Sequence, residues 1–333
     1  MNNANKKPKV IAIVGPTASG KTNISIQTAK KLNGTSSKPP AKQSSASAFT
    51  LPLRSGEIIS ADSRLVYKDF NIGTAKPSKE EIAEITHHLI DVESPSKTYT
   101  ASRYKNEAAE KIKEILNKNK VPIIVGGTGF YVRALLEGLN IPDVRPDEDF
   151  RKKMEDFVKE NGKEALYKKL QESDPKMAEK LYRQDSFRII RALEVQNATG
   201  QKMSELQTIS EPEYDVLYVG LNAEDRDFLY ERINRRVLLM IEQGLVEEVK
   251  SLIEKYGRTN SLLKTLGYKE ICEYFDGIYT LEEAIANIQQ HTRKFAKRQL
   301  TWFRANKKIN WFFIDKIDSA TIIEEIVKNY HKK

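Results

Sequence analysis

The stretch "GPTASGKT", residues Gly15–Thr22, follows the apolar run "VIAIV" at residues 10–14 and precedes "NISIQTAKKL" at residues 23–32. Its spacing is the G-x-x-x-x-G-K-[ST] pattern of a phosphate-binding loop, or P-loop. The apolar run before the Gly-Pro turn predicts a buried parallel strand, and residues 23–32 predict a helix that ends at Asn33-Gly34. Strand, loop and helix in this order are the context that the motif requires.

The P-loop motif indicates a phosphate ligand without naming it. Its backbone amides and the following helix N-terminus surround an anion. This geometry places Lys21 against the terminal phosphates and the Thr22 hydroxyl on Mg²⁺. Because these roles do not depend on a nucleotide base, the motif fits a kinase, an ATPase or any enzyme that binds a diphosphate.

The rest of the chain alternates strand and helix patterns. Further strands are predicted at residues 57–60, 121–125, 215–222 and 309–314, and helices at residues 104–117, 226–253 and 281–306, with a break at Gly244. This alternation predicts an α/β fold with a P-loop NTPase-like parallel sheet covered by helices. Ligands of such sheets bind beyond the carboxyl ends of the strands. We therefore expect the P-loop, Asp62 and residues 126–131 to converge.

Two segments depart from this alternation. Residues 141–208 are dense in charge with helical patterns, and they predict a helical insertion domain between the two parts of the catalytic core, residues 8–140 and 209–333. Residues 35–56 are rich in Ser, Pro, Ala and Lys without periodicity. They predict a low-complexity surface insertion that we expect to be disordered and dispensable.

Composition restricts the partners. The 333 residues carry a formal net charge of +9, which favours a polyanionic partner. Nucleic acid is favoured over a membrane because no apolar run approaches a bilayer span. Cys272 is the only cysteine, which excludes a disulfide framework and a cysteine zinc site. The polar opening "MNNANKKPK" lacks the apolar region of a signal peptide, so we expect the cytoplasm.

One absence weakens the ATPase interpretation. Nucleotide hydrolases and many kinases end an apolar strand with an Asp that helps to hold Mg²⁺. The most apolar predicted strand, residues 121–125, is followed by "GGTGFY", which has no carboxylate. Asp91 follows only two apolar residues and is a weak substitute.

Asp62 and Thr128 each allow two interpretations. Asp62, in "SADSRLVY", is either a cap or turn residue or a general base. Because phosphates repel a carboxylate, Asp62 is better explained if it faces a second substrate and accepts a proton from a nucleophile. The Thr128 hydroxyl bonds either a substrate or its own turn. His87 and His88 point to opposite faces of a strand, and packing is favoured over a metal site.

Basic residues cluster near the C-terminal end. Residues 287–308 contain seven Lys or Arg and no acid, which indicates either a solvated helix face or an RNA-binding face. The aromatic residues Phe295, Trp302 and Phe303 are interleaved with them, although their spacing also fits core packing. Exposed bases can stack on aromatic or Arg planes while Lys and Arg hold phosphates.

Eight ordered blocks together resemble one family. They are "GPTASGKT", "ISADSRLVYKDFNIGTAKPS", "HHLIDVESP", "VGGTGFYVRALLEGL", "RIIRALEV", "GLVEEV", "KTLGYKE" and "RKFAKRQLTWFR". Their order over Val10 to Phe313, apart from the insertion, resembles that of the tRNA dimethylallyltransferases, or tRNA isopentenyltransferases. No His/Cys zinc-finger pattern follows Phe313, so the chain is similar to the shorter, bacterial-type members.

The resemblance implies a prenyltransferase whose P-loop binds a diphosphate instead of ATP. Such enzymes transfer a dimethylallyl group from dimethylallyl diphosphate to N6 of the adenosine 3′ to the anticodon of tRNA. The implied partners are the tRNA anticodon stem-loop and dimethylallyl diphosphate, the implied cofactor is Mg²⁺, and we expect a monomer. The target base would be extruded from its stack into the site.

The resemblance also implies roles for individual residues. Asp62 is the general base, Thr128 contacts substrate near the reaction centre, and Lys21, Arg232 and Arg236 are basic groups near the diphosphate. The implied diphosphate-binding residues are Gly15, Pro16, Thr17, Ala18, Ser19, Gly20, Lys21 and Thr22, with Thr22 on Mg²⁺. The implied tRNA-binding residues are Asp62, Ser63, Arg64, Leu65, Thr128, Arg151, Phe187, Arg188, Ile189, Ile190, Arg191, Lys264, Thr265, Leu266, Gly267, Tyr268 and Lys269.

Leu65 departs from the family pattern, and two other functions stay open. Many members carry Gln at this position. If that Gln hydrogen-bonds an anticodon-loop base in those members, this chain reads the base differently or uses Arg64. The first alternative is an adenylate prenyltransferase that acts on a free nucleotide, which the helical insertion and the basic C-terminal half argue against. The second is an RNA-binding protein gated by ATP.

Overall fold

The computed structural model describes residues 7–34 and 55–332. The insertion predicted at residues 35–56 therefore lies outside the described residues except at its end. There the prediction was wrong, because Gly56 is the first residue of strand β2, Gly56–Ser60. A Cβ at Gly56 would lie 2.6 Å from Ile123 Cδ1. This glycine is a close-packing position in the sheet and not a loop residue.

The described residues form strands and helices at the following bounds. The strands are β1 (Lys9–Val14), β2 (Gly56–Ser60), β3 (His87–His88), β4 (Val121–Gly126), β5 (Asp215–Asn222) and β6 (Asn310–Phe313). The helices of the first half are α1 (Lys21–Gly34), α2 (Lys79–Glu84), α3 (Ala101–Asn117), α4 (Gly129–Leu136), α5 (Glu148–Ser173), α6 (Pro175–Lys180), α7 (Ser186–Thr199) and α8 (Met203–Leu206). Those that follow are α9 (Arg226–Glu242), α10 (Leu245–Tyr256), α11 (Asn260–Leu263), α12 (Tyr268–Phe275), α13 (Leu281–Arg304) and α14 (Ser319–His331).

The strands make one parallel sheet in the order β3-β2-β4-β1-β5-β6. Each neighbouring pair is parallel, with Val14 of β1 opposite both Gly126 of β4 and Gly220 of β5. The predicted α/β fold with a P-loop NTPase-like sheet is confirmed. Because β1 and β2 both flank β4, the loops after these three strands begin side by side.

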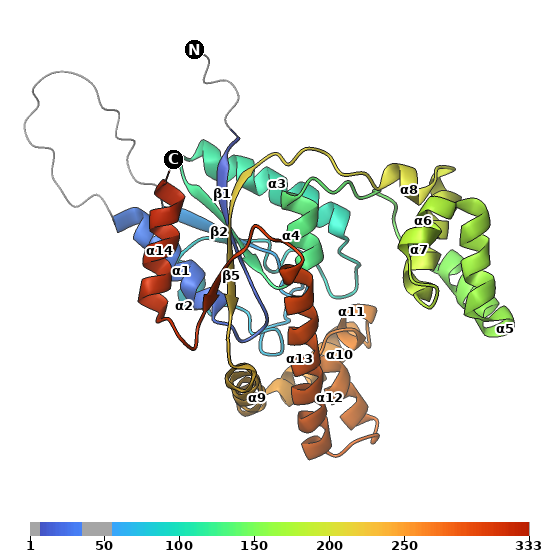
Figure 1. Ribbon diagram of the computed structural model, residues 1–333. Helices are drawn as coiled ribbons and strands as arrows, with labels where there is room; N and C mark the ends of the chain where they lie inside the picture. The colour runs from blue at the N-terminus through green and yellow to red at the C-terminus, as the bar shows by residue number, and fades with distance from the viewer. Residues whose placement is uncertain (1–6, 35–54, 333) are drawn as a thin grey trace, which may run out of the picture. The chain divides into compact units, whose positions relative to one another are not determined.

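The core forms around β1, whose residues Val10–Val14 are fully buried. Apolar residues of α1 and α14 pack together against the sheet, Ile24 and Leu32 from the first and Ile322 and Ile326 from the second. Figure 1 shows these two helices next to each other beside the strands. Each buried Ile or Leu side chain contributes about 1.5–3 kcal/mol, so this layer holds the strand that presents the P-loop.

The predicted helices after β5 are present, with one difference in what they bury. Gly244 (φ 97°) separates α9 from α10 at the predicted break. In α13, Ile288, Ala296, Gln299 and Phe303 are buried, whereas Phe295 and Trp302 are 38% and 37% exposed. The buried face therefore includes the polar residue Gln299, which a search for apolar spacing does not select.

The chain divides into two compact units. We name the described residues of Met1–Tyr99, Glu107–Val132 and Glu213–Lys333 the sheet unit, and Thr100–Asn106 with Arg133–Pro212 the helical unit. The helical unit has its own apolar cluster, which includes Leu166, Leu170 and Ile189. The domain boundaries expected from the sequence stay a prediction. Within residues 7–34 and 55–332, no helix has the length and apolar character needed to span a bilayer.

Candidate active site

Three loops at the carboxyl ends of adjacent strands build the candidate site. The P-loop follows β1, Asp62 lies two residues after β2, and Thr128 lies two residues after β4. Since β4 is hydrogen-bonded to both β1 and β2, these loops leave the sheet at one edge. This is the edge at which parallel sheets bind ligands.

The P-loop has the backbone form of an anion cradle. Gly20 (φ 82°) and Ala18 (φ 62°) are in the left-handed region that turns successive amides inward. Gly15 (φ 150°) has no room for a side chain, because a Cβ would lie 2.3 Å from the Leu221 carbonyl oxygen. Ser19 Oγ is buried and has no hydrogen-bond partner among the described residues. An anion in the loop would supply an acceptor for this hydroxyl.

Lys21 is held in the loop at the start of α1. Its Nζ donates a hydrogen bond to the Pro16 carbonyl oxygen at 2.6 Å. Burial and the neighbouring Arg236 lower the pKa of Lys21 to about 7, and the Asp62 carboxylate partly opposes this change. The ammonium therefore lacks a strong counter-charge in the free protein, and a diphosphate would supply one.

The loops that carry Asp62 and Thr128 are joined directly. Thr128 Oγ1 accepts a hydrogen bond from the Ser63 backbone N–H at 3.0 Å, and its backbone N–H donates to the Ala61 carbonyl oxygen at 3.1 Å. Asp62 Oδ1 accepts from the Arg64 backbone N–H at 2.8 Å. That bond orients the carboxylate, whose second oxygen has no hydrogen bond from the described residues and is able to accept a proton.

Both arginines expected near the diphosphate lie by the P-loop. Arg232 Nε donates to the Ala18 carbonyl oxygen at 2.9 Å. Arg236 donates to the Thr74 carbonyl oxygen at 3.5 Å, and its charge acts on that of Lys21. Burial lowers the pKa of Arg236, while Asp62 raises it. Helix α9 thus places two guanidinium groups beside the anion cradle.

The side chains around the P-loop fit a Mg²⁺ ion only if the substrate supplies some of the oxygen ligands of the ion. Within the described part of the chain, no three His, Cys, Asp or Glu side chains form a group that could hold a metal ion. Mg²⁺ commonly combines few protein ligands with substrate phosphates and water, and the Thr22 hydroxyl at the α1 N-terminus would be such a ligand. His87 bonds the Ile85 carbonyl oxygen and His88 bonds Glu57, as packing residues do.

Comparison with known proteins identifies the family. A family model described as IPP transferase matches residues 65–306. The chain belongs to the IPP transferase family. A tRNA dimethylallyltransferase of Thermoanaerobacter sp. (strain X514) is 42% identical over 329 residues, which cover 97% of this chain and 96% of the relative.

Solved structures of similar proteins agree with the IPP transferase assignment. The full-length tRNA isopentenylpyrophosphate transferase from Bacillus halodurans matches with a TM-score of 0.68 and 40% identity, over 97% of this chain and 95% of that one. A eukaryotic dimethylallyltransferase acting on tRNA matches with a TM-score of 0.74 and 29% identity, over 97% and 80% of the two chains. The resemblance seen in the eight sequence blocks is confirmed.

In this member of the IPP transferase family, the helical unit exposes only part of the expected tRNA-binding segment. Phe187 is 67% exposed and Arg188 is also exposed, whereas Ile189 and Ile190 are buried in the helical core. Arg191 pairs with Glu194, as does Arg151, whose Nε lies 2.7 Å from a Glu194 oxygen. Within the expected segment Phe187–Arg191, Phe187 and Arg188 are therefore the fully exposed side chains.

The second expected tRNA-binding segment, Lys264–Lys269, also contains both exposed and buried residues. Lys264 and Lys269 are exposed, Leu266 is partly exposed, and Thr265 and Gly267 are buried. Tyr268 is fully buried, and its hydroxyl donates to Glu248 at 2.7 Å. The two lysines are thus the charged groups that this segment offers to a phosphate backbone, while Tyr268 supports the fold.

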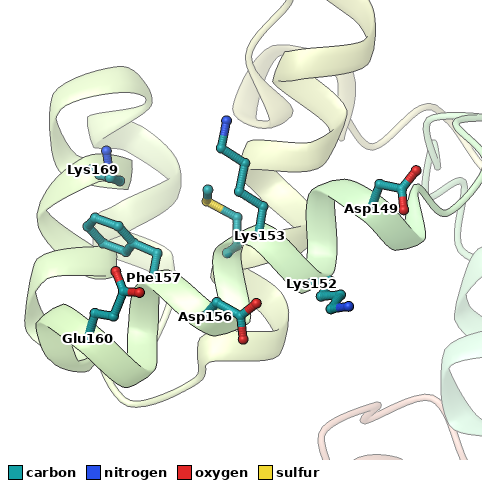
Figure 2. A pocket seen from close by; sticks show the side chains of 8 residues that line it. Asp149, Lys152, Lys153, Asp156, Phe157, Glu160 and Lys169 are labelled. Atoms are coloured by element: carbon teal, nitrogen blue, oxygen red, sulfur yellow. The ribbon is translucent and has the colours of Figure 1, made fainter.

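A hollow of ≈ 570 Å³ lies along α5 in the helical unit (Figure 2). Gly162 (φ 80°) breaks α5 into two arms, and Lys169 Nζ lies 4.6 Å from the centre of the Phe157 ring. The lining contains as many acidic as basic side chains, which gives no preference for an anion. These residues are Asp149, Lys152, Lys153, Met154, Asp156, Phe157, Glu160 and Lys169, and none of them was expected at a site.

Sequence reasoning missed two polar residues that organise the site. Buried Gln299 of α13 bonds both the P-loop residue Thr17 and the Gly127 carbonyl oxygen. Glu248 of α10 accepts hydrogen bonds from the backbone N–H groups of residues 71–73, next to the Thr74 carbonyl that Arg236 contacts. Each lies inside a block that resembles the family, but nothing in its spacing indicates a partner so distant in the chain.

Proposed function

We propose that this protein transfers a dimethylallyl group from dimethylallyl diphosphate to N6 of the adenosine 3′ to the anticodon of tRNA. The observation that carries the proposal is the junction of an anion-binding P-loop with an oriented carboxylate at one sheet edge, in a chain of the IPP transferase family. In the reaction the N6–C1 bond forms, the C1–O bond breaks, and diphosphate leaves.

The P-loop side of the site supports departure of the diphosphate. Lys21, Arg232 and Arg236 supply positive charge, and Ser19 Oγ is a hydroxyl in need of an acceptor. Fixed donors aimed at developing negative charge lower the barrier, since they need no rearrangement during the reaction. Mg²⁺ held by Thr22 would add further neutralisation of the diphosphate when bound.

Asp62 and Thr128 supply the acceptor side. An exocyclic adenine amine is a weak nucleophile, and Asp62 takes its proton as the new bond forms or holds the amine in line for attack. The Ser63–Thr128 hydrogen bond keeps the two loops together. The target base would have to leave its stack to reach a site at the strand ends, as in other enzymes that act on a base.

The exposed tRNA-binding candidates are Phe187, Arg188, Lys264 and Lys269. In the helical unit the Phe187 ring suits stacking on an exposed base, and in the sheet unit the two lysines suit contacts to phosphates. Other polar candidates near the reaction centre are Ser63 and Arg64. We further propose that the protein acts as a monomer in the cytoplasm.

A transfer assay with labelled dimethylallyl diphosphate separates this function from its alternatives. The reaction is run with tRNA, with AMP and without any acceptor, and each of these reactions is run with and without Mg²⁺. The proposal predicts label on tRNA alone. Label on AMP but not on tRNA would identify an adenylate prenyltransferase, and ATP binding without any transfer would favour an ATP-gated RNA-binding protein.

A further inference from the structure

A buried amide on α13 connects the two halves of the site. Gln299 is 6% exposed. Its Oε1 accepts a hydrogen bond from the Thr17 backbone N–H at 2.9 Å, and its Nε2 donates to the Gly127 carbonyl oxygen at 3.0 Å. A primary amide presents a donor and an acceptor in one planar group, and both are used here.

Two glycines allow α13 to approach this closely. A Cβ at Gly127 would lie 2.1 Å from Gln299 Nε2, and a Cβ at Gly129 would lie 2.0 Å from Trp302 Cδ1. Gln299 and Trp302 are three residues apart and therefore lie on one face of the helix. That face contacts both residues that flank Thr128.

We infer that Gln299 is a positioning residue that sets the P-loop against the Thr128 loop, acting through Thr17 and Gly127. The inference rests on the proposed function, because the P-loop holds the leaving diphosphate and the Thr128 loop holds the acceptor side. Transfer needs the reacting atoms aligned, and a displacement of about 1 Å can cost on the order of 100-fold in rate. Gln299 fixes this separation without touching either substrate.

Two substitutions remove different parts of this connection. Gln299→Met keeps the length of the side chain and loses both hydrogen bonds. Gln299→Glu keeps an acceptor for the Thr17 N–H, but as a carboxylate it has no proton to donate to Gly127. Thr301→Ala is the matched control, since Thr301 is exposed on the same helix and, among residues 7–34 and 55–332, its hydroxyl bonds only the Lys297 carbonyl oxygen.

The experiment measures single-turnover transfer at saturating substrate together with tRNA affinity and near-ultraviolet circular dichroism. Both Gln299 variants should lose on the order of 10- to 100-fold in rate, while the tRNA Kd changes by less than about threefold. Thr301→Ala should match the wild type. A wild-type rate in folded Gln299→Met, or a rate loss matched by an equal loss of tRNA affinity, would overturn the inference.

The pH profile of Gln299→Glu separates positioning from a general loss of structure. A neutral carboxylic acid restores a donor toward Gly127, and burial favours that neutral form. The ratio of the Gln299→Glu rate to the wild-type rate should therefore rise as pH falls from about 8.5 to about 6. The titration of groups that both proteins share, such as Lys21, cancels in this ratio. A flat ratio would overturn the inference alone, whereas absence of wild-type transfer would overturn the proposed function and this inference together.

Discussion

The Ser63 backbone N–H donates a hydrogen bond to Thr128 Oγ1 at 3.0 Å, which joins the loop after β2 to the loop after β4. Asp62, the neighbour of Ser63, is therefore held at a fixed place relative to Thr128. With Gln299 joining the second loop to the P-loop, the three loops form one connected frame. Substitutions of residues in this frame should therefore lower the rate of dimethylallyl transfer more than the affinity for tRNA.

Replacing Asp62 by Asn should abolish proton acceptance while keeping the turn, because an amide oxygen can still accept from the Arg64 N–H. We expect the transfer rate to fall by on the order of 10²–10⁴, with the tRNA Kd unchanged within about twofold. Asp69→Asn is the charge-matched control, since Asp69 bonds Lys255 and Tyr256. A strong loss of tRNA binding in Asp62→Asn would instead assign Asp62 a structural role.

Diphosphate binding should depend on pH through Lys21. Its pKa in the free protein is lowered from 10.5 to about 7, so the amine is largely neutral above that pH and protonated below it. A bound anion favours the ammonium and raises the pKa again, so binding takes up a proton above about pH 7 and weakens as pH rises.

Calorimetry of inorganic diphosphate in buffers with different ionisation enthalpies measures this uptake. The wild type at about pH 8 should take up more protons than Lys21→Met, with the difference shrinking at about pH 6. Protons taken up by the diphosphate itself are measured with Lys21→Met, which lacks the Lys21 amine, and they are subtracted from the wild-type value. Equal uptake by both proteins at the higher pH would refute the role of Lys21.

Gly126→Ala should destabilise the sheet unit. A Cβ there would lie 2.2 Å from the Ala61 carbonyl oxygen, and a backbone atom cannot rotate away. We expect a loss of about 1–3 kcal/mol in the free energy of unfolding, measured by urea denaturation. In Gly277→Ala the added Cβ has nothing within 4 Å, and only its φ of 71° is strained, so its loss should be smaller. A larger loss in Gly277→Ala than in Gly126→Ala would contradict the close packing of Gly126 against Ala61.

Exposed cations of α13 should contribute to tRNA affinity. Lys294, Lys297 and Arg298 are exposed, on the side of the helix that its buried residues leave free. Replacing Lys294 and Lys297 by Gln should weaken tRNA binding and reduce the slope of log K against log salt by roughly 0.7–0.9 for each phosphate that is no longer neutralised. Filter binding across a salt series measures this slope. The same change in Lys328→Gln, on α14, would show a non-specific effect of charge.

The sequence predicted what depends on local pattern. The apolar run, glycine spacing and Lys-Thr pair of the P-loop determine local geometry, so β1, the loop and α1 follow from them, and Asp62 and Thr128 were found as polar residues after strands. Gln299 and Glu248 were not found, because their partners are distant in sequence and set by tertiary packing. Likewise, Ile189 and Tyr268 lie in blocks expected to contact tRNA but are buried, which only the packing of their helices reveals.

Locating the transferred dimethylallyl group on tRNA tests the proposed reaction at the atom where it occurs. The labelled product is digested to nucleosides and identified by mass spectrometry, using one tRNA and a copy in which the adenosine 3′ to the anticodon is replaced by guanosine. Transfer to that adenosine predicts N6-dimethylallyl adenosine from the first tRNA and no transfer to the second. Equal labelling of both tRNAs would contradict this site of transfer.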